Sequence, residues 1–237
     1  MKKNFDLKNN SINDEKCKNV EVQTTNSYSD NKFKVDINKY HKAHLYKRYM
    51  QDSSPGVSVS GLFDITKILK AKKKGCIFNA MMCYCILQAS QNVEEFHYSI
   101  KPDGLYYYDY TKIGSVIEGK NGEHYFGEYR YFKSFLDFQE NYKKISKYCY
   151  ENCDNYEEDS GAKIATSSIP NFSFTSISLD VSNNFWDNFV SWGKFQKKWF
   201  KVKVYISLRF HHATVDGKSA GEFFNELQKQ FDNFKIQ

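Results

Sequence analysis

His211-His212-Ala213-Thr214-Val215-Asp216-Gly217 is the stretch that decides the fold of this chain of 237 residues. The nine residues before it, 202–210, alternate apolar and polar side chains, which predicts a half-buried β-strand. The pattern Ser219-Ala220-Gly221-Glu222 resembles a capping box, so we expect a helix to begin there. The apolar face of that helix carries Ala220, Phe223, Phe224, Leu227, Phe231 and Phe234. The paired histidines therefore lie on a tight strand-to-helix turn.

This turn favours catalysis over metal binding. Adjacent side chains on an extended segment point to opposite sides, so His211 and His212 rarely reach one ion. A turn anchored at both ends can instead aim one imidazole at a substrate. The spacing of Cys149 and Cys153 is compatible with a metal, but no second pair accompanies them. We therefore expect a catalytic histidine and no metal site.

Length and composition point to one large domain. A chain of 237 residues can bury a substantial core, and 18 Tyr and 20 Phe predict an interior built largely from rings. The net charge of +6 is scattered, which does not indicate a nucleic-acid binder. The apolar segment 77–87 is too short to span a bilayer and predicts a buried helix. Because no apolar run opens the sequence, we expect no signal peptide and a cytoplasmic protein with reduced thiols.

Residues 1–30 are polar and predict a flexible extension, and residues 31–237 predict a single domain. Helices are expected at 40–50, 66–74, 77–87 and 132–153, with an acidic loop at 152–161. Strands are expected at 57–65, 96–100, 105–110, 113–118, 125–131 and 172–179. Because hairpins mix with helices in this order, we predict an α+β fold, a two-layer sandwich with a mixed β-sheet covered by helices.

The turn and five other stretches resemble the chloramphenicol acetyltransferase family over residues 31–234. In the family these stretches read Asp-Ile/Val-x-x-Trp-x-Arg, Ile-Asp-Ile-Thr, Ser-x-x-Pro-Trp with Phe-x-Ser-Phe-x-Leu-Asn, Met-Gly-Lys-Tyr and Asn-Glu-Leu-Gln. Here the similar stretches are Asp36-Ile37-Asn38-Lys39-Tyr40-His41-Lys42, Phe63-Asp64-Ile65-Thr66, Ser167-Ser168-Ile169-Pro170 with Phe174-Thr175-Ser176 and Leu179, Gly193-Lys194-Phe195, and Asn225-Glu226-Leu227-Gln228. The resemblance implies the fold of CoA-dependent acyltransferases.

The same resemblance implies a homotrimer with active sites at subunit interfaces and acetyl-CoA as co-substrate. The reaction would be direct transfer of acetyl to a hydroxyl of chloramphenicol, which inactivates the antibiotic. His212 would match the general base, which an alcohol needs because its own pKa is too high for unaided attack. Ser167 would match a serine that stabilises the oxyanion, and Ser191 a threonine that positions a water.

Other matched positions carry structural roles or departures. Asp216 and Gly217 would match a structural Asp-Gly, in which the aspartate pairs with an arginine that holds the histidine turn. Here Lys42 stands at the arginine's place, and a lysine offers a point charge without a planar fork. Arg209 on the adjacent strand is an alternative partner for Asp216.

The substrate positions also depart from the family. Tyr49 would match a tyrosine that contacts the antibiotic, while Arg48 stands where the family has an apolar ring. On the CoA side the matched positions are Asn171, in place of a tryptophan, and Lys194. Two alternatives therefore stay open beside chloramphenicol acetylation: the same chemistry on another alcohol, or a trimeric ligand-binding homologue with impaired catalysis.

Overall fold

Strand β10 (Lys201–His211) runs through the interior of a mixed sheet in a computed structural model that describes residues 31–72, 74–158, 161–178 and 186–237. The strand order is β2-β10-β8-β7-β5-β6, and β9 pairs with the start of β10. β5, β7 and β8 are parallel to one another, and the other pairs are antiparallel. The other strands are β2 (Gly56–Asp64), β5 (Thr111–Glu118), β6 (His124–Tyr129), β7 (Ala162–Ile169), β8 (Asn188–Gly193) and β9 (Gln196–Lys198).

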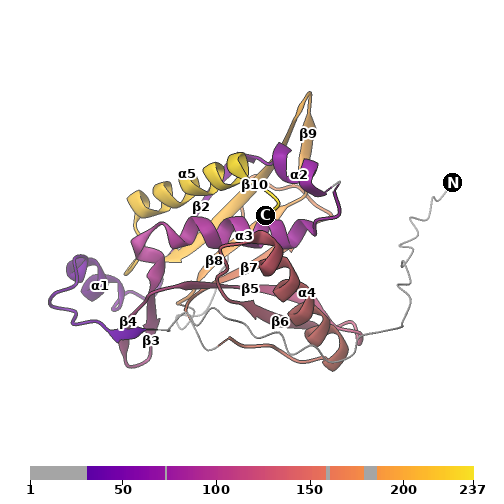
Figure 1. The fold of residues 1–237 in the computed structure, drawn as a ribbon. Helices are drawn as coiled ribbons and strands as arrows, with labels where there is room; N and C mark the ends of the chain where they lie inside the picture. The colour runs from indigo at the N-terminus through magenta and orange to yellow at the C-terminus, as the bar shows by residue number, and fades with distance from the viewer. Residues whose placement is uncertain (1–30, 73, 159–160, 179–185) are drawn as a thin grey trace.

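Helices cover one face of this sheet (Figure 1). They are α2 (Thr66–Lys72), α3 (Phe78–Gln91), α4 (Phe135–Asn152) and α5 (Gly217–Asn233). Every second side chain of β10 joins their core, namely Val204, Ile206, Leu208 and Phe210. Helix α3 packs against both α4 and α5, so even Cys83 and Cys85 are buried. Burial raises the pKa of the Cys83 thiol to about 12, so it behaves as a small apolar side chain.

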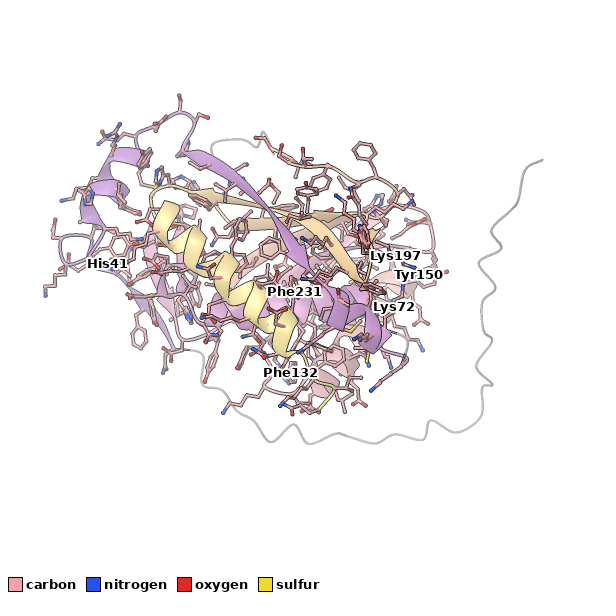
Figure 2. The ribbon with its side chains drawn as sticks, turned by 90° about the horizontal axis from the view of Figure 1, so that it is seen from above. His41, Lys72, Phe132, Tyr150, Lys197 and Phe231 are labelled. Atoms are coloured by element: carbon pink, nitrogen blue, oxygen red, sulfur yellow. The ribbon has the colours of Figure 1, made fainter. Side chains whose placement is uncertain are left out.

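A smaller unit packs at one end of the molecule. It holds β1 (Lys32–Lys34), α1 (Ala43–Tyr49), the 3₁₀ helix η1 (Glu94–His97), β3 (Tyr98–Lys101) and β4 (Gly104–Tyr108). Its core cluster consists of Tyr40, Tyr46, Ile100, Leu105 and Ala213, so it includes the turn after β10. Figure 2 shows His41 at this end and both Lys72 and Lys197 at the opposite end. The smaller unit is therefore what fixes the surroundings of the turn.

The predicted α+β architecture with a mixed sheet is confirmed. The start of the last helix, the start of the strand expected at 96–100, where Phe96 and His97 belong to η1, and the strand expected at 172–179 are wrong. Helix α5 begins at Gly217 and not at a capping box on Ser219, because the Asp216 carboxylate accepts the Ser219 N–H at 2.9 Å. Residues 172–178 form no strand. They cross the sheet face opposite the helices, where the Ser207 hydroxyl donates to the Ile177 carbonyl at 2.8 Å. Leu179, the last residue of that expected strand, lies outside the described residues.

Residues 1–30, expected to be a flexible extension, also lie outside the described part of the chain. Within that part, no helix is long and apolar enough to cross a membrane. The expected acidic loop 152–161 contains one parallel bridge, between Tyr156 and Gly127, and residues 159–160 of it are not described.

Candidate active site

The two histidines of the turn have opposite hydrogen-bonding roles. His211, the last residue of β10, is buried, and its Nδ1 accepts the Ala213 N–H at 3.2 Å. His212 Nδ1 lies 3.0 Å from the Val215 carbonyl. Because a carbonyl only accepts, His212 carries its proton on Nδ1, and the lone pair of Nε2 is left for another partner. Burial, with Arg209 and His212 nearby, lowers the pKa of His211 to about 4. His211 is thus a neutral structural group, and His212 has the tautomer of a base.

Asp216 closes the turn by capping α5. Its Oδ1 accepts from both the N–H and the hydroxyl of Ser219, at 2.9 and 3.0 Å. Partial burial alone would raise the pKa of this carboxyl. The Ser219 hydrogen bonds and the Lys42 ammonium outweigh burial and hold the pKa well below its usual range. The turn is therefore held at its start by β10 and at its end by a charged cap.

Lys42 pairs with Asp216, the partner expected from the resemblance, at 2.9 Å between Nζ and Oδ2. The same ammonium lies 2.5 Å from Glu95 Oε1 and donates to Ser219 Oγ at 2.8 Å. Glu95 was not among the site residues predicted from the sequence. It lies far from Lys42 in the chain, and Glu94-Glu95 has no local pattern that marks it as a site.

Tyr49, the last residue of α1, covers one face of the His212 ring. Its ring stacks on the His212 ring with centroids 4.3 Å apart and planes 23° apart. The Arg48 guanidinium carbon lies 5.4 Å from the centroid of the same Tyr49 ring. The structure therefore brings together His212, Tyr49 and Arg48. The positive charge of Arg48 lies beside the ring that is expected to contact the acceptor alcohol.

Ser167 and Ser191 are cross-strand neighbours on β7 and β8, and Ser191 is paired in turn with Ser207 on β10. Ser207 continues the row to Ser60 on β2, whose hydroxyl donates to Ser207 Oγ at 2.9 Å. Alternation along the strands places this serine row on the sheet face opposite the helices. The two predicted serines are therefore together, and Ser207 and Ser60 extend their row.

The serine row is remote from His212 within one chain. Ser167 lies two strands across from Ser207, and His212 lies five residues further along the chain. Two strand spacings amount to about 10 Å across the sheet, and five residues amount to about 17 Å along the strand. Because these directions are nearly perpendicular, Ser167 and His212 are about 20 Å apart. One acetyl group cannot contact both side chains at that distance. If both act in one reaction, they come from different copies of the chain.

The family model described as chloramphenicol acetyltransferase matches residues 30–228, most of the chain. The chain belongs to this family. The family and the acyltransferase class predicted from the sequence are thereby confirmed.

Relatives in the chloramphenicol acetyltransferase family match along nearly their whole length. Chloramphenicol acetyltransferase 2 of Escherichia coli is 26% identical over 206 residues, which cover 84% of this chain and 97% of the relative. The Clostridium butyricum enzyme is 29% identical over 213 residues, covering 85% and 95%. A solved chloramphenicol acetyltransferase superposes with a TM-score of 0.71 at 24% identity, over 84% of this chain and 98% of that one. The fold is therefore that of CoA-dependent acyltransferases.

In this member of the chloramphenicol acetyltransferase family, the two candidate CoA residues lie beside one another. The Lys194 N–H donates at 2.7 Å to the carbonyl of Phe172, the residue after Asn171. Gly193 permits this approach, because a Cβ there would lie 2.9 Å from the Phe172 oxygen. Asn171 and Lys194 are both exposed. Lys194 lies between β8 and β9, and the β9–β10 hairpin is at the end of the molecule opposite α1 (Figure 1).

Gly217 shares the turn with His212, but the residues that the structure describes give no steric reason for glycine there. An added Cβ at Gly217 would meet no atom within 4 Å.

Among the residues that the structure describes, no three His, Cys, Asp or Glu side chains gather as metal ligands. The turn is therefore built from one charged cap, one stacked tyrosine and one imidazole of fixed tautomer.

Proposed function

We propose that this chain is an acetyl-CoA-dependent O-acetyltransferase that acetylates a hydroxyl of chloramphenicol in the cytoplasm, with His212 as general base. The single observation that carries the proposal is the hydrogen bond from His212 Nδ1 to the Val215 carbonyl. It leaves Nε2 unprotonated and able to take a proton from an alcohol. The family match and the relatives named chloramphenicol acetyltransferase support this acceptor.

In the proposed reaction the acceptor oxygen bonds to the thioester carbonyl carbon of acetyl-CoA while its proton moves to His212 Nε2. The tetrahedral intermediate collapses, the carbon–sulfur bond breaks, and the CoA thiolate takes the proton from the imidazolium. Ser167 donates a hydrogen bond to the oxyanion, and Ser191 positions a water beside it. Asn171 and Lys194 bind CoA, and Tyr49 and Arg48 line the acceptor side.

A homotrimer with sites at its interfaces is part of this proposal. The separation of about 20 Å between Ser167 and His212 in one chain supports it, since only two copies can bring these side chains together. One copy then contributes His212, Tyr49 and Arg48 to each site. Its neighbour contributes Ser167 and Ser191 from the sheet face opposite the helices.

The same chemistry on a different alcohol is the second candidate, and Arg48 favours it. A nitrophenyl group needs a largely apolar wall, whereas the guanidinium over the Tyr49 ring adds a charge. The intact pair between Lys42 and Asp216 argues against the third alternative, a binding protein with impaired catalysis.

Release of CoA thiol from acetyl-CoA, with and without chloramphenicol, tests these readings. We expect chloramphenicol-dependent release that falls by about 10²- to 10⁴-fold in His212→Ala, because the general base is lost. His124→Ala, on the exposed start of β6, is the matched control and keeps full activity. Chloramphenicol affinity, measured by calorimetry, stays unchanged in both variants.

Other outcomes separate the alternatives. Binding of chloramphenicol without thiol release by the wild-type protein would support the impaired homologue. Neither binding nor release would point to another alcohol, with the search beginning at Arg48 and Tyr49. Activity that survives in His212→Ala would remove the proposed mechanism.

A further inference from the structure

The Lys42 ammonium has as many acceptors as it has protons. An ammonium offers three N–H donors. Its partners are Glu95 Oε1 at 2.5 Å, Ser219 Oγ at 2.8 Å and Asp216 Oδ2 at 2.9 Å. The side chains of Lys42 and Glu95 are only 11% and 13% exposed, so water screens these charges weakly. Lys42 is therefore held from three directions in a shielded site.

Glu95 is the partner that approaches from outside the turn. It lies on η1, whereas Asp216 and Ser219 belong to the turn and to the start of α5. Its neighbour Phe96 is fully buried and stacks on Phe223 of α5, with ring centroids 4.6 Å apart. This packing fixes η1 relative to α5, so the Glu95 carboxylate is a fixed anchor for the flexible four-carbon stem of Lys42.

Lys42 needs such an anchor because its ammonium lacks the planar pair of N–H groups that an arginine guanidinium offers to a carboxylate. An arginine at this place could bind the Asp216 carboxylate through two N–H groups, which sets its direction. A single ammonium sets only a distance and can move around the carboxylate. A second carboxylate on the far side removes that freedom.

The direction of Asp216 matters for the base, because Asp216 directly follows Val215 in the chain. The Val215 carbonyl accepts from His212 Nδ1 at 3.0 Å, and Asp216 fixes the same segment to α5. We propose that Glu95 is a positioning residue that holds Lys42 against Asp216 and so keeps the Val215 carbonyl where it fixes the tautomer of His212. This inference rests on the proposed role of His212 as the base.

Glu94 supplies a matched control. It precedes Glu95, its side chain is 61% exposed, and it accepts from the Tyr98 hydroxyl at 3.0 Å. His41 lies near both carboxylates, at 3.8 Å from Glu94 and 3.7 Å from Glu95. Glu94→Gln and Glu95→Gln thus remove one charge each beside the same histidine. Only Glu95→Gln removes a charge that contacts Lys42.

The experiment measures the His212 tautomer and steady-state kinetics in the full chain. Nitrogen-15 NMR of histidine-labelled protein shows which ring nitrogen carries the proton, with the His212 signal assigned by its loss in His212→Ala. We expect Nδ1–H in the wild-type protein and in Glu94→Gln, and a mixture of tautomers in Glu95→Gln. We also expect kcat to fall about tenfold in Glu95→Gln, the factor that one charge-assisted hydrogen bond corresponds to. Both KM values should stay within about twofold.

Lys42→Arg in the Glu95→Gln background is the rescue, because the arginine fork fixes Asp216 without Glu95. It should restore both the tautomer and kcat. An unchanged tautomer in Glu95→Gln, or a lost kcat that Lys42→Arg does not restore, would overturn the inference. The NMR measurement needs no substrate. The wild-type protein could show Nδ1–H, and Glu95→Gln the mixture of tautomers, while chloramphenicol is not acetylated. In that case the proposed acceptor is wrong and the positioning role of Glu95 stands.

Discussion

His211 and His212 differ because their Nδ1 atoms face different backbone groups. His211 Nδ1 faces an N–H and must be unprotonated, whereas His212 Nδ1 faces a carbonyl and must be protonated. The His211 ring is buried, which disfavours its charged form, whereas the His212 ring is only partly buried. Two identical residues thus divide into a structural group and a candidate base.

The lowered pKa of His211, to about 4, makes stability depend on pH. Between that value and the usual value of about 6.5, the unfolded chain holds the proton and the folded chain does not. Folding stability should therefore fall as pH drops below about 6.5, by at most about 1.4 kcal/mol per pH unit from this residue. His211→Asn, which keeps an acceptor for the Ala213 N–H, should flatten this dependence.

Urea unfolding at fixed protein concentration, from pH 7.5 to 4.5, measures the effect. His124→Asn is the control, since that ring is exposed and should leave the wild-type slope unchanged. A His211→Asn variant with the wild-type slope would show that other groups carry the pH dependence.

At the scale of elements, β10 connects the two ends of the molecule. Its last residue starts the histidine turn, and its first pairs with β9 in a hairpin that projects from the body (Figure 1). Lys198 is paired with Lys201, so Trp199 and Phe200 form a two-residue loop. Both rings are almost completely exposed, and Trp199 has a φ of 54°.

The left-handed backbone at Trp199 costs about 1 kcal/mol in a residue with a Cβ, and asparagine tolerates it better. Since the ring is 99% exposed, Trp199→Asn should raise the free energy of unfolding by up to about 1 kcal/mol. Urea unfolding measures it, with Phe200→Asn as the control without a left-handed φ. A destabilised Trp199→Asn would instead indicate that the ring packs against another copy.

In the molecule as a whole, the candidate site residues lie in two remote parts of the chain. His212 lies beside α1, and Ser167 lies on the sheet face opposite the helices, about 20 Å away by strand geometry. A trimer joins the two parts only if one copy presents its turn to the sheet face of the next.

Mixed trimers test this arrangement. Trimers reassembled from equal amounts of His212→Ala and Ser167→Ala chains should regain activity, because about a quarter of their interfaces combine an intact His212 with an intact Ser167. Each variant alone should stay impaired. Thiol release after co-refolding measures it, and size-exclusion chromatography checks assembly. Mixed trimers no more active than the better parent would place both residues in one chain's site.

The turn, its flanking strand and helix, and the family could all be predicted from the amino-acid sequence. Local patterns sufficed for these, because alternation in β10 and helical spacing in α5 depend on near neighbours in the chain. The start of α5 was misplaced at Ser219, since Asp216 and Ser219 are both good caps and the choice depends on where the chain leaves β10. Residues 172–178 alternate like a strand, yet they cross the sheet because β8 already occupies the place beside β7.

Packing and strand register decide which charged groups contact one another and which side chains lie too far apart to act together. The sequence offered Lys42 and Arg209 as partners for Asp216, and packing placed Lys42 there together with Glu95. Strand register, which no local pattern specifies, put Ser167 beside Ser191 and far from His212. A residue's type and spacing determine what it can do. The distances between residues remote in sequence, set by packing and register, decide which of them act together.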